Sequence, residues 1–324
     1  MKIGILGSGA FGSALATVLV DNNNEVLMWT PFEEEREYIE RTKLIRSVPG
    51  VRLNKKIKVT TNVDQVLEFS EVLIIAIPAK NTSELLDSIK NKFNKDTHVC
   101  IATKGLEEST GLFMHEIVKK YLNTDKICIL SGPSFAIDLF KKSQVGLALS
   151  SMNEETADIV EDVFENSYFK LRQNKDVIGT EICGSIKNVI AIASGILDGL
   201  NSSESTRAML LTEALHDMDN IITNLGGDER TILSYAGFGD LLLTCNSSKS
   251  RNYSFGKFIG KEKNPRKIKK YLSTNTVEGY NALLAIHKLL KDRKIKIPMI
   301  NLIYDIVMGK KNPKEILSFL IEKE

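Results

Sequence analysis

The chain has 324 residues, of which 43% are hydrophobic and 26% are charged, a composition typical of a soluble globular protein. This length predicts about two domains, each able to bury its own core. The net charge of +2 leaves no large basic excess to neutralise phosphates, which argues against nucleic acid as an obligatory partner. The basic stretch Lys257–Lys270 is the local exception, and we interpret it as a solvated helix face.

Cysteine usage and hydropathy indicate the compartment. The cysteines have no close pairs, so we expect reduced thiols, no disulfide framework and no metal site. The short apolar run at the N-terminus is interrupted by Gly7, Gly9 and Gly12, which predicts a strand and turn and not a signal peptide. No segment approaches the ~18 uninterrupted apolar residues of a membrane helix. We therefore predict a cytoplasmic protein without membrane insertion. The four cysteines are Cys100, Cys128, Cys183 and Cys245.

The first half of the chain alternates β-rich runs with helical patterns. Continuous apolar runs such as Val72–Ile77 indicate strands buried on both faces, as in a helix-covered, mostly parallel sheet. This pattern predicts a Rossmann-like, doubly wound α/β domain over residues 1–178. Helices are expected most clearly at Phe11–Val20, Asn81–Asn91 and Glu154–Phe164. Strands are expected at Ile3–Leu6, Glu25–Trp29, Ile57–Thr61, Val72–Ile77, His98–Thr103, Ile127–Ser131, Val145–Leu149 and Phe169–Arg172.

The pattern changes after about Val177. Apolar residues then recur at helical spacing, and no convincing strand follows. We predict an all-α second domain over residues 179–324. Its expected helices are Ile182–Leu200, Arg207–Leu225, Thr276–Leu290 and Ile300–Val307.

A glycine motif lies at the end of the first predicted strand. Gly7-Ser8-Gly9-Ala10-Phe11-Gly12 fits G-x-G-x-x-G and opens a helical run, which is the context that the motif requires. The first glycine permits a tight turn, the second lets backbone N–H groups approach a pyrophosphate, and the third lets the helix pack closely on the sheet. The positive helix end then favours the anion. The motif predicts binding of NAD or NADP.

The choice between NAD and NADP depends on the end of the second strand. That strand ends at Trp29-Thr30-Pro31-Phe32, with Glu33, Glu34 and Glu35 directly after it. No arginine lies at the strand tip, and the acidic run would repel a 2′-phosphate, so the sequence slightly favours NAD and leaves dual use open. An alternative is that these glutamates only begin a helix, where negative charge is favourable in any case.

Polar residues follow two further strands of the predicted sheet. Lys104-Gly105 comes after the strand near Thr103, and Gly132-Pro133-Ser134-Phe135-Ala136 comes after Ile127–Ser131. The carboxyl edge of such a sheet is where ligands bind. We expect the first to place an ammonium there, and the second to form a rigid turn with backbone donors and a hydroxyl.

In the helical half, Lys187 and Asn188 lie on an otherwise apolar helix, Ile186–Leu197. A buried lysine there would be costly without a partner or a task, and the alternative is an exposed lysine at a helix start. Asp240, Thr244 and Ser250-Arg251-Asn252 add polar groups, and Arg251 suits a bidentate grip on phosphate. A fixed lysine, an anion-binding arginine and a phosphate cradle point to a reductase acting on a small phosphorylated ketone.

These motifs together resemble those of a known family. They occur in the same order as in the NAD(P)-dependent sn-glycerol-3-phosphate dehydrogenases, and the sequence is similar to the soluble, bacterial type from the first strand to about Pro298. The ordered set is Gly7–Gly12, Lys104-Gly105, Gly132-Pro133-Ser134-Phe135-Ala136, Glu181-Ile182-Cys183-Gly184-Ser185-Ile186-Lys187-Asn188-Val189, Gly239-Asp240-Leu241, Ser250-Arg251-Asn252 and Val277-Glu278-Gly279.

The resemblance implies a Rossmann-like domain joined to a helical one, a homodimer, and reversible reduction of dihydroxyacetone phosphate for glycerophospholipid synthesis. It implies two catalytic lysines, Lys187 as the general acid/base and Lys104 as a second lysine that touches substrate and cofactor. The residues and the resemblance together assign substrate binding to Lys104, Gly132, Ser134, Lys187, Asn188, Asp240, Thr244, Ser250, Arg251 and Asn252. They assign cofactor binding to Gly7, Gly9, Ala10, Phe11, Gly12, Phe32, Lys104, Ala136, Arg251, Thr276, Val277 and Glu278.

The sequence also departs from the family pattern. Phe11 replaces a frequent tryptophan, no histidine or arginine stands near Pro31 and Phe32, and Glu213 occupies the place of a usual arginine. Two alternatives stay open: a related two-domain hydroxyacid or ketopantoate reductase, and a non-catalytic dinucleotide sensor. None of the four histidines has a Gly-rich or phosphate-binding context, so we expect structural or surface roles for them. They are His98, His115, His216 and His287.

Overall fold

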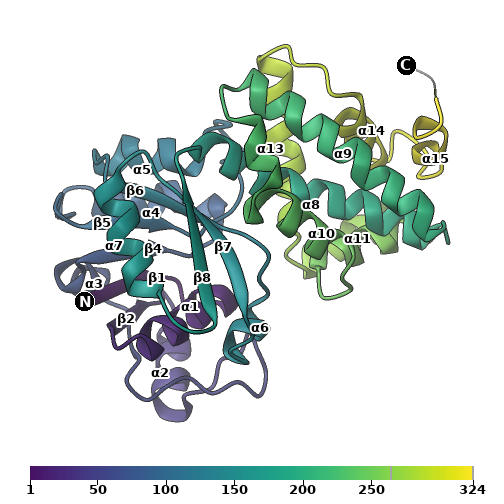
Figure 1. The fold of residues 1–324 in the computed structure, drawn as a ribbon. Coiled ribbons are helices and arrows are strands. Elements are labelled where there is room, and N and C mark those ends of the chain that lie inside the picture. The colour runs from purple at the N-terminus through teal and green to yellow at the C-terminus, as the bar shows by residue number, and fades with distance from the viewer. Residues whose placement is uncertain (263–264, 323–324) are drawn as a thin grey trace. The chain divides into compact units, whose positions relative to one another are not determined.

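The protein, represented by a computed structural model, is described over residues 1–262 and 265–322. It divides into two compact units (Figure 1). Unit 1 comprises Met1–Lys104 and Met114–Val177, and unit 2 comprises Gly105–Phe113 and Ile178–Glu324. These units differ from the ranges 1–178 and 179–324 by the short segment Gly105–Phe113 and by Ile178.

Unit 1 is built on one eight-stranded sheet with the order β3-β2-β1-β4-β5-β6-β7-β8. Neighbouring strands are parallel except β6 and β7, which are antiparallel. The predicted Rossmann-like, mostly parallel sheet is confirmed, and each predicted strand is present. The strands are β1 (Lys2–Leu6), β2 (Glu25–Trp29), β3 (Lys58–Thr60), β4 (Val72–Ile75), β5 (His98–Ile101), β6 (Ile127–Ser131), β7 (Val145–Ser150) and β8 (Phe169–Asn174).

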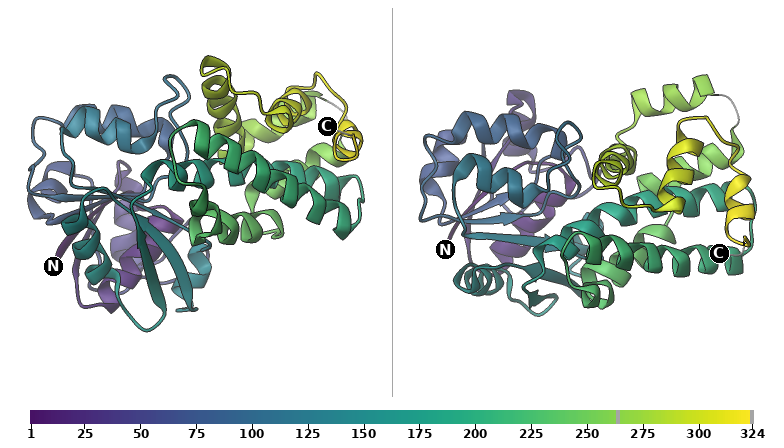
Figure 2. Two further views of the ribbon diagram at one scale, coloured as in Figure 1. Left: turned by 45° about the horizontal axis from the view of Figure 1, so that its top comes forward. Right: turned by 90° about the horizontal axis from the view of Figure 1, so that it is seen from above.

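Helices cover both faces of this sheet (Figures 1 and 2). Apolar side chains of α1, α6 and α7 form one core with Ile3 and Ile5 on one face of the sheet. On the opposite face, α3 lies close to Gly4, where a Cβ would meet Val66 and Ser70. Because the strand order reverses between β1 and β4, the carboxyl ends of these strands form the switch point where ligands bind. The helices are α1 (Ala10–Asp21), α2 (Glu33–Thr42), α3 (Val63–Phe69), η1 (Ala79–Asn81), α4 (Thr82–Ile89), α5 (Met114–Leu122), α6 (Ala136–Phe140) and α7 (Glu154–Phe164).

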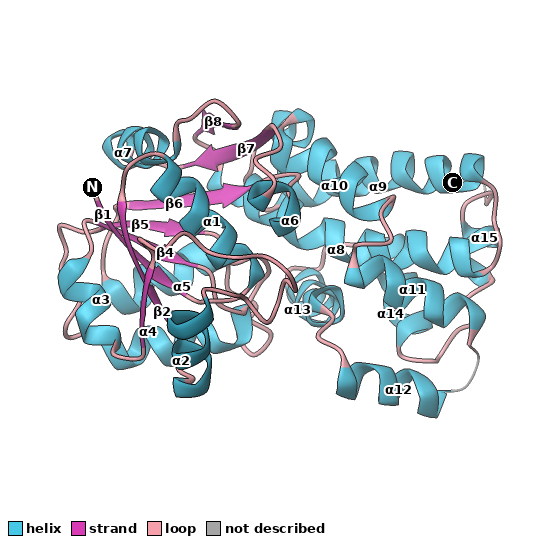
Figure 3. Ribbon diagram, turned by 90° about the horizontal axis from the view of Figure 1, so that it is seen from below, coloured by secondary structure: helices cyan, strands magenta, loops and turns pink. Residues whose placement is uncertain are grey.

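The described residues of unit 2 from Ile178 onward form helices and connecting loops without strands, as predicted (Figure 3), and the segment Gly105–Phe113 adds one antiparallel bridge between Leu106 and Phe113. Its central helix has a mean hydropathy of 1.3 and is long and apolar enough to cross a membrane, but 94% of that window is buried inside the protein. The helix meets this test by its average hydropathy and not by an uninterrupted apolar run, which Glu181, Lys187 and Asn188 break. The helices are α8 (Val177–Gly199), α9 (Glu204–Asn224), η2 (Glu229–Leu233), η3 (Tyr235–Gly239), α10 (Asp240–Cys245), α11 (Arg251–Lys261), α12 (Pro265–Thr274), α13 (Glu278–Asp292), α14 (Pro298–Val307) and α15 (Glu315–Phe319).

The backbones of α8 and α11 touch, because glycines remove the side chains between them. A Cβ added to Gly256 would lie 1.9 Å from the carbonyl oxygen of Ile192, and one added to Gly195 would lie 2.0 Å from that of Tyr253. One turn further on, Gly260 stands in the same relation to Ile196, at 2.4 Å. These contacts leave no room for even a methyl group, and we call this contact the α8–α11 crossing.

We expect Gly256→Ala to destabilise unit 2, although alanine is ordinarily the better helix former by ~1 kcal/mol. The added methyl would meet backbone atoms that cannot rotate away, so the free energy of unfolding should fall by roughly 3 kcal/mol. Urea unfolding followed by far-ultraviolet circular dichroism measures this. Lys261→Ala, at an exposed position of the same helix, is the control and should change little. Unchanged stability of Gly256→Ala would mean that the two helices are not in backbone contact.

Helix α9 carries two acidic side chains one turn apart, Glu213 and Asp217. The Oδ2 atom of Asp217 is buried and has no hydrogen-bond partner among the described residues. Burial and the negative charge of Glu213 raise the pKa of Asp217 from 3.8 to about 6, against a smaller opposing effect of His216. The departure of Glu213 from the family's usual arginine thus has a physical consequence, because it adds a like charge to a carboxylate that is already desolvated.

The pKa of Asp217 makes the stability of unit 2 depend on pH. The folded state binds the proton of Asp217 more tightly than the unfolded state does. The contribution of this proton to the free energy of unfolding is therefore fully present below pH 3.8 and is lost as the pH rises through about 6. Asp217→Asn removes the ionised form, so its advantage over the parent protein should grow across this window, by up to ~3 kcal/mol. Thermal unfolding midpoints of parent and variant, taken at intervals of about one pH unit from about pH 4 to about pH 8, measure this difference in stability. Glu213→Gln should reproduce part of the gain, and parallel pH profiles for parent and variants would contradict the prediction.

Candidate active site

The glycine motif forms the turn between β1 and α1. Gly7 has a φ of +126°, and its N–H donates to the carbonyl of Trp29 at 3.0 Å. A Cβ on Gly7 would lie 2.5 Å from the carbonyl oxygen of Ala76 on the β4 side of the switch point, and one on Gly12 would lie 2.4 Å from the carbonyl oxygen of Gly7. Both positions therefore exclude any side chain, as the motif predicts.

Gly9 differs from the other two glycines, because no atom lies within 4 Å of the place where its Cβ would be. It is the N-cap of α1, and no side chain caps the backbone N–H groups of that helix end. Ala10 and Phe11 are the first residues of the helix. An open space at an uncapped helix N-terminus, with positive dipole charge, suits an anionic group, so these residues fit the pyrophosphate of a dinucleotide.

Lys104 and Ser134 lie at the carboxyl ends of β5 and β6. The Nζ of Lys104 donates to the carbonyl of Gly132 at 3.4 Å, which connects the two loops. Gly132 also accepts from the N–H of Ser134 at 3.0 Å, which closes the predicted tight turn before Ala136 begins α6. The Ser134 hydroxyl is buried and has no hydrogen-bond partner among the described residues. An ammonium and an uncommitted hydroxyl in adjacent loops are groups that bind anionic or carbonyl oxygens.

At the tip of β2, the glutamates begin a helix and also place negative charge where a 2′-phosphate would lie, so both interpretations of the sequence apply. Glu33 begins α2, and Phe32, its N-cap, is 64% exposed. The carboxylate of Glu33 accepts from Arg36 at Nε (2.9 Å) and from the hydroxyl of Thr61 (3.1 Å). Arg36 also lies 3.7 Å from Glu37. The one arginine in the first turn of α2 is thus shared between two carboxylates.

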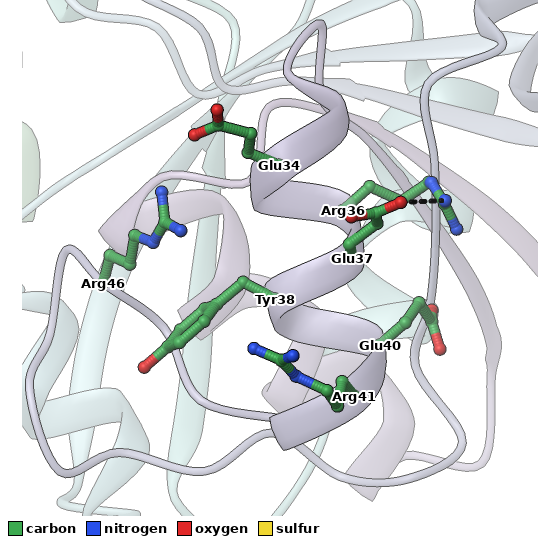
Figure 4. A pocket seen from close by; sticks show the side chains of 7 residues that line it. All are labelled: Glu34, Arg36, Glu37, Tyr38, Glu40, Arg41 and Arg46. Carbon is green, nitrogen blue, oxygen red and sulfur yellow. Dashed lines mark ion pairs between the residues drawn. The ribbon is translucent and has the colours of Figure 1, made fainter.

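A surface hollow of 520 Å³ lies along α2 and the loop after it (Figure 4). Arg46 lies over the ring of Tyr38, with its guanidinium carbon 4.8 Å from the ring centre. Three carboxylates and three guanidinium groups line the hollow, so it has no net positive charge, and it includes none of the predicted site residues. The lining residues are Glu34, Arg36, Glu37, Tyr38, Glu40, Arg41 and Arg46.

Unit 2 brings Lys187, Asp240 and Thr244 together. The Nζ of Lys187 forms an ion pair with Oδ1 of Asp240 and donates to the hydroxyl of Thr244 at 3.2 Å. The same hydroxyl lies 3.2 Å from Oδ1 of Asp240, which closes a triangle. Lys187 is 6% exposed and Asp240 is 1% exposed. The alternative of an exposed lysine at a helix start is wrong, because α8 begins ten residues earlier, at Val177.

The three side chains of this triangle are buried. Asp240 is the first residue of α10, where the helix dipole favours a carboxylate. The thiol of Cys245 contacts the carbonyl of Lys187 at 3.9 Å, and burial raises the pKa of this thiol, so it is neutral. A buried ion pair costs more desolvation energy than a well-packed apolar pair, so stability alone does not account for it. A buried ammonium with a fixed orientation is instead suited to proton transfer.

A second set of contacts connects α8, α11 and the start of α13. Asn252 donates through Nδ2 to Oδ1 of Asn188 at 2.9 Å, and its Oδ1 accepts from the N–H of Gly279 at 2.8 Å. A Cβ on Gly279 would lie 2.6 Å from the carbonyl oxygen of Asn188. Sequence reasoning assigned Asn188 and Asn252 to substrate binding and gave no role to Gly279. The structure shows that these amides also position helices.

Arg251 lies beside this set, at the N-terminus of α11. Its guanidinium is exposed and lies 3.4 Å from the carboxylate of Glu278, the first residue of α13. The hydroxyl of Ser250 accepts from the N–H of Tyr253 at 3.2 Å and so caps α11. Two predicted cofactor residues, Thr276 and Val277, precede Glu278, the first exposed and the second buried. Unit 2 therefore groups an arginine, a glutamate and two helix N-termini.

Other titratable side chains have structural partners. His98 bonds through Nδ1 to the hydroxyl of Thr156 at 2.9 Å, and burial lowers its pKa. His287 stacks on Tyr304, with ring centres 3.8 Å apart. Within residues 1–262 and 265–322, no group of three His, Cys, Asp or Glu side chains is placed to hold a metal ion, and the four cysteines are buried and form no disulfide.

Comparison with known proteins shows the family of the chain. Residues 2–157 match the family model of the NAD-dependent glycerol-3-phosphate dehydrogenase N-terminus, and residues 176–318 match that of its C-terminus. The chain is 35% identical to a glycerol-3-phosphate dehydrogenase [NAD(P)+] of Thermoanaerobacter, covering 100% of this chain and 98% of that protein. It is 34% identical to one of Bacillus pumilus, covering 96% and 91%.

Solved structures show the same fold. A crystal structure of glycerol-3-phosphate dehydrogenase from Coxiella burnetii superposes with a TM-score of 0.93 at 28% identity, covering 99% of this chain and 98% of that one. A ketopantoate reductase from Ralstonia eutropha reaches 0.65 at 12% identity, covering 98% and 100%, and therefore shares the fold only. Both family models cover this chain in order and almost end to end. The chain belongs to the NAD-dependent glycerol-3-phosphate dehydrogenase family.

Proposed function

We propose that this protein reversibly reduces dihydroxyacetone phosphate to sn-glycerol 3-phosphate with a nicotinamide dinucleotide, with Lys187 as the general acid. The observation that carries the proposal is the buried ammonium of Lys187, which Asp240 and Thr244 hold in one orientation. The family membership of the whole chain supports the substrate and the reaction.

The chemistry is a ketone reduction. When bound, the dinucleotide supplies a hydride to the ketone carbon, so that the C=O π bond breaks and its electron pair moves to oxygen. Lys187 donates a proton from Nζ to that oxygen, which gives the alcohol and a neutral amine. Asp240 keeps the lysine charged until this transfer, since a carboxylate within contact distance favours the ammonium form. In the oxidative direction the amine takes the proton back.

Other residues bind and orient the substrate. Lys104 and the free hydroxyl of Ser134 provide donors for the substrate oxygens at the sheet edge. Arg251, at the capped N-terminus of α11, provides a planar guanidinium and a helix dipole for the phosphate. Gripping the phosphate at a remote site orients the reacting carbon, so that binding energy is used for the reaction.

We further propose that NAD is preferred over NADP. A 2′-phosphate needs a cation near the tip of β2, and Arg36 in the first turn of α2 is already paired with Glu33 and Glu37. The neighbouring hollow has as many acidic as basic side chains. A phosphate placed there would meet carboxylates with no surplus of cations to offset them, whereas a ribose hydroxyl could donate to one of those carboxylates.

The protein is further proposed to be a cytoplasmic homodimer that supplies glycerol phosphate for phospholipid synthesis. The resemblance implies these properties, and exposed apolar side chains on η2, η3 and α10 support a contact between copies. They are Leu233 (83% exposed), Phe238 (45%) and Leu242 (44%). Light scattering of the purified protein measures the mass in solution.

The reaction is tested by mixing the purified protein with dihydroxyacetone phosphate and following oxidation of NADH and NADPH in parallel. We expect turnover with both cofactors and a higher kcat/KM with NADH. Ketopantoate and 2-oxo acids are the control substrates. Turnover of these in place of the phosphorylated ketone would establish the related reductase. The single tryptophan, Trp29, reports dinucleotide binding by its fluorescence, so binding without turnover of any substrate would establish a sensor.

We expect Lys187→Met to lower kcat by at least ~10²-fold, as for loss of a general acid. Because methionine leaves Asp240 without its buried partner, circular dichroism must show that the variant is folded, and Trp29 fluorescence must show that unit 1 still binds the dinucleotide. Lys257→Met is the matched control, since Lys257 pairs with Asp198 at 2.7 Å on the far part of α8. A folded Lys187→Met protein with parental turnover would remove this lysine from the mechanism.

A further inference from the structure

Helix α12 (Figure 3) has exposed basic side chains on one side, and its apolar side chains pack against the core of unit 2. Tyr271 packs against the rings of Phe255 and Phe258, with ring centres 5.4 and 4.9 Å apart. Ile268 and Leu272 pack against the same core. These contacts fix the rotation of the helix, so its outward face is defined. That face carries Arg266, Lys267, Lys269 and Lys270, all of them exposed.

The charge of this region is separated from that of the remaining chain. Six of the ten residues from 261 to 270 are Lys or Arg and one is Glu, which gives +5, whereas the chain as a whole has +2 and the remainder therefore −3. Residues 263–264 belong to this count by sequence and lie outside the described part. Glu262 pairs with Lys267 at 2.8 Å, and no further acid occurs before Glu278. A solvated helix face alone does not require cations to be concentrated in this way.

We propose that the face formed by α12 and the end of α11, which we call the α12 basic face, binds the surface of a membrane that contains anionic phospholipids. The contact is electrostatic and peripheral, because the apolar side chains of α12 already pack against the core of unit 2. The negative remainder of the chain is repelled from the same surface, so the protein meets it with this face. This inference concerns binding alone and does not depend on the proposed reaction.

The chemistry of the face favours a lipid surface over single-stranded nucleic acid. Proteins that bind nucleic acid strands combine basic grooves with exposed aromatic side chains on which bases stack. The aromatic residue of α12, Tyr271, is instead packed between Phe255 and Phe258. Lysines near an anionic leaflet each contribute ~1 kcal/mol without any need for a shaped pocket. A convex helix with regularly exposed lysines fits such a charged plane.

The test is flotation of the full-length protein with vesicles of phosphatidylcholine that contain about 30% phosphatidylglycerol, with pure phosphatidylcholine vesicles as reference. We expect binding to the anionic vesicles at ~50 mM salt and its loss at ~500 mM, where charges are screened. The variant Lys261→Gln/Lys269→Gln/Lys270→Gln should lower the partition coefficient ~10²-fold, from ~1 kcal/mol for each lysine. Its thermal unfolding midpoint should be that of the parent.

The matched control removes the same charge from unit 1. Lys55→Gln/Lys56→Gln/Lys58→Gln replaces three exposed lysines before and on β3, and it should float like the parent. Equal loss of binding in the two triple variants would show a general charge effect and overturn the proposal. Absence of flotation with anionic vesicles at low salt would overturn it as well. Retention of single-stranded RNA without vesicle binding would assign the α12 basic face to nucleic acid instead.

Discussion

The helical unit depends on the α8–α11 crossing, where two backbones touch at Gly195, Gly256 and Gly260. Only this distance lets the short amide of Asn252 reach Asn188 on the neighbouring helix and still accept the N–H of Gly279. These contacts also fix the positions of the neighbouring residues Arg251 and Glu278. Arg251 and Glu278 thus come within 3.4 Å of each other because the helices that carry them are held by this packing.

The ion pair between Lys187 and Asp240, unlike the α8–α11 crossing, reduces the stability of the helical unit. Burying both charges sacrifices stability that an apolar pair of similar size would provide. The surrounding unit compensates with an extensive apolar core contributed by α8, α9, α13 and α14. This division of roles is consistent with a site that holds a proton donor in low dielectric, where its interaction with a developing oxyanion is strong.

Sequence patterns predicted the elements well wherever a local run of apolar residues itself determines the secondary structure. Apolar runs buried on both faces predicted each strand of the sheet, and Glu25–Trp29 and Ile127–Ser131 agree to the residue. The start of α8 was misplaced because Gly179, Gly184 and Glu181 interrupt the apolar period at its first turns. Burial by neighbouring helices, which no local pattern encodes, decides the conformation of that segment.

The two parts of the candidate site also differ in how far a local sequence pattern identifies them. The nucleotide cradle depends on positions that exclude side chains, so Gly7 and Gly12 identify it in a single stretch of sequence. The lysine site depends on partners 53 residues apart, and neither Lys187 nor Asp240 has a local signal that names the other. The residues and the resemblance together assigned Asp240 to substrate binding and gave it no electrostatic role beside Lys187. The contact between the two side chains adds such a role, because the carboxylate of Asp240 stabilises the ammonium form of Lys187, which is the form that the proposed proton transfer requires.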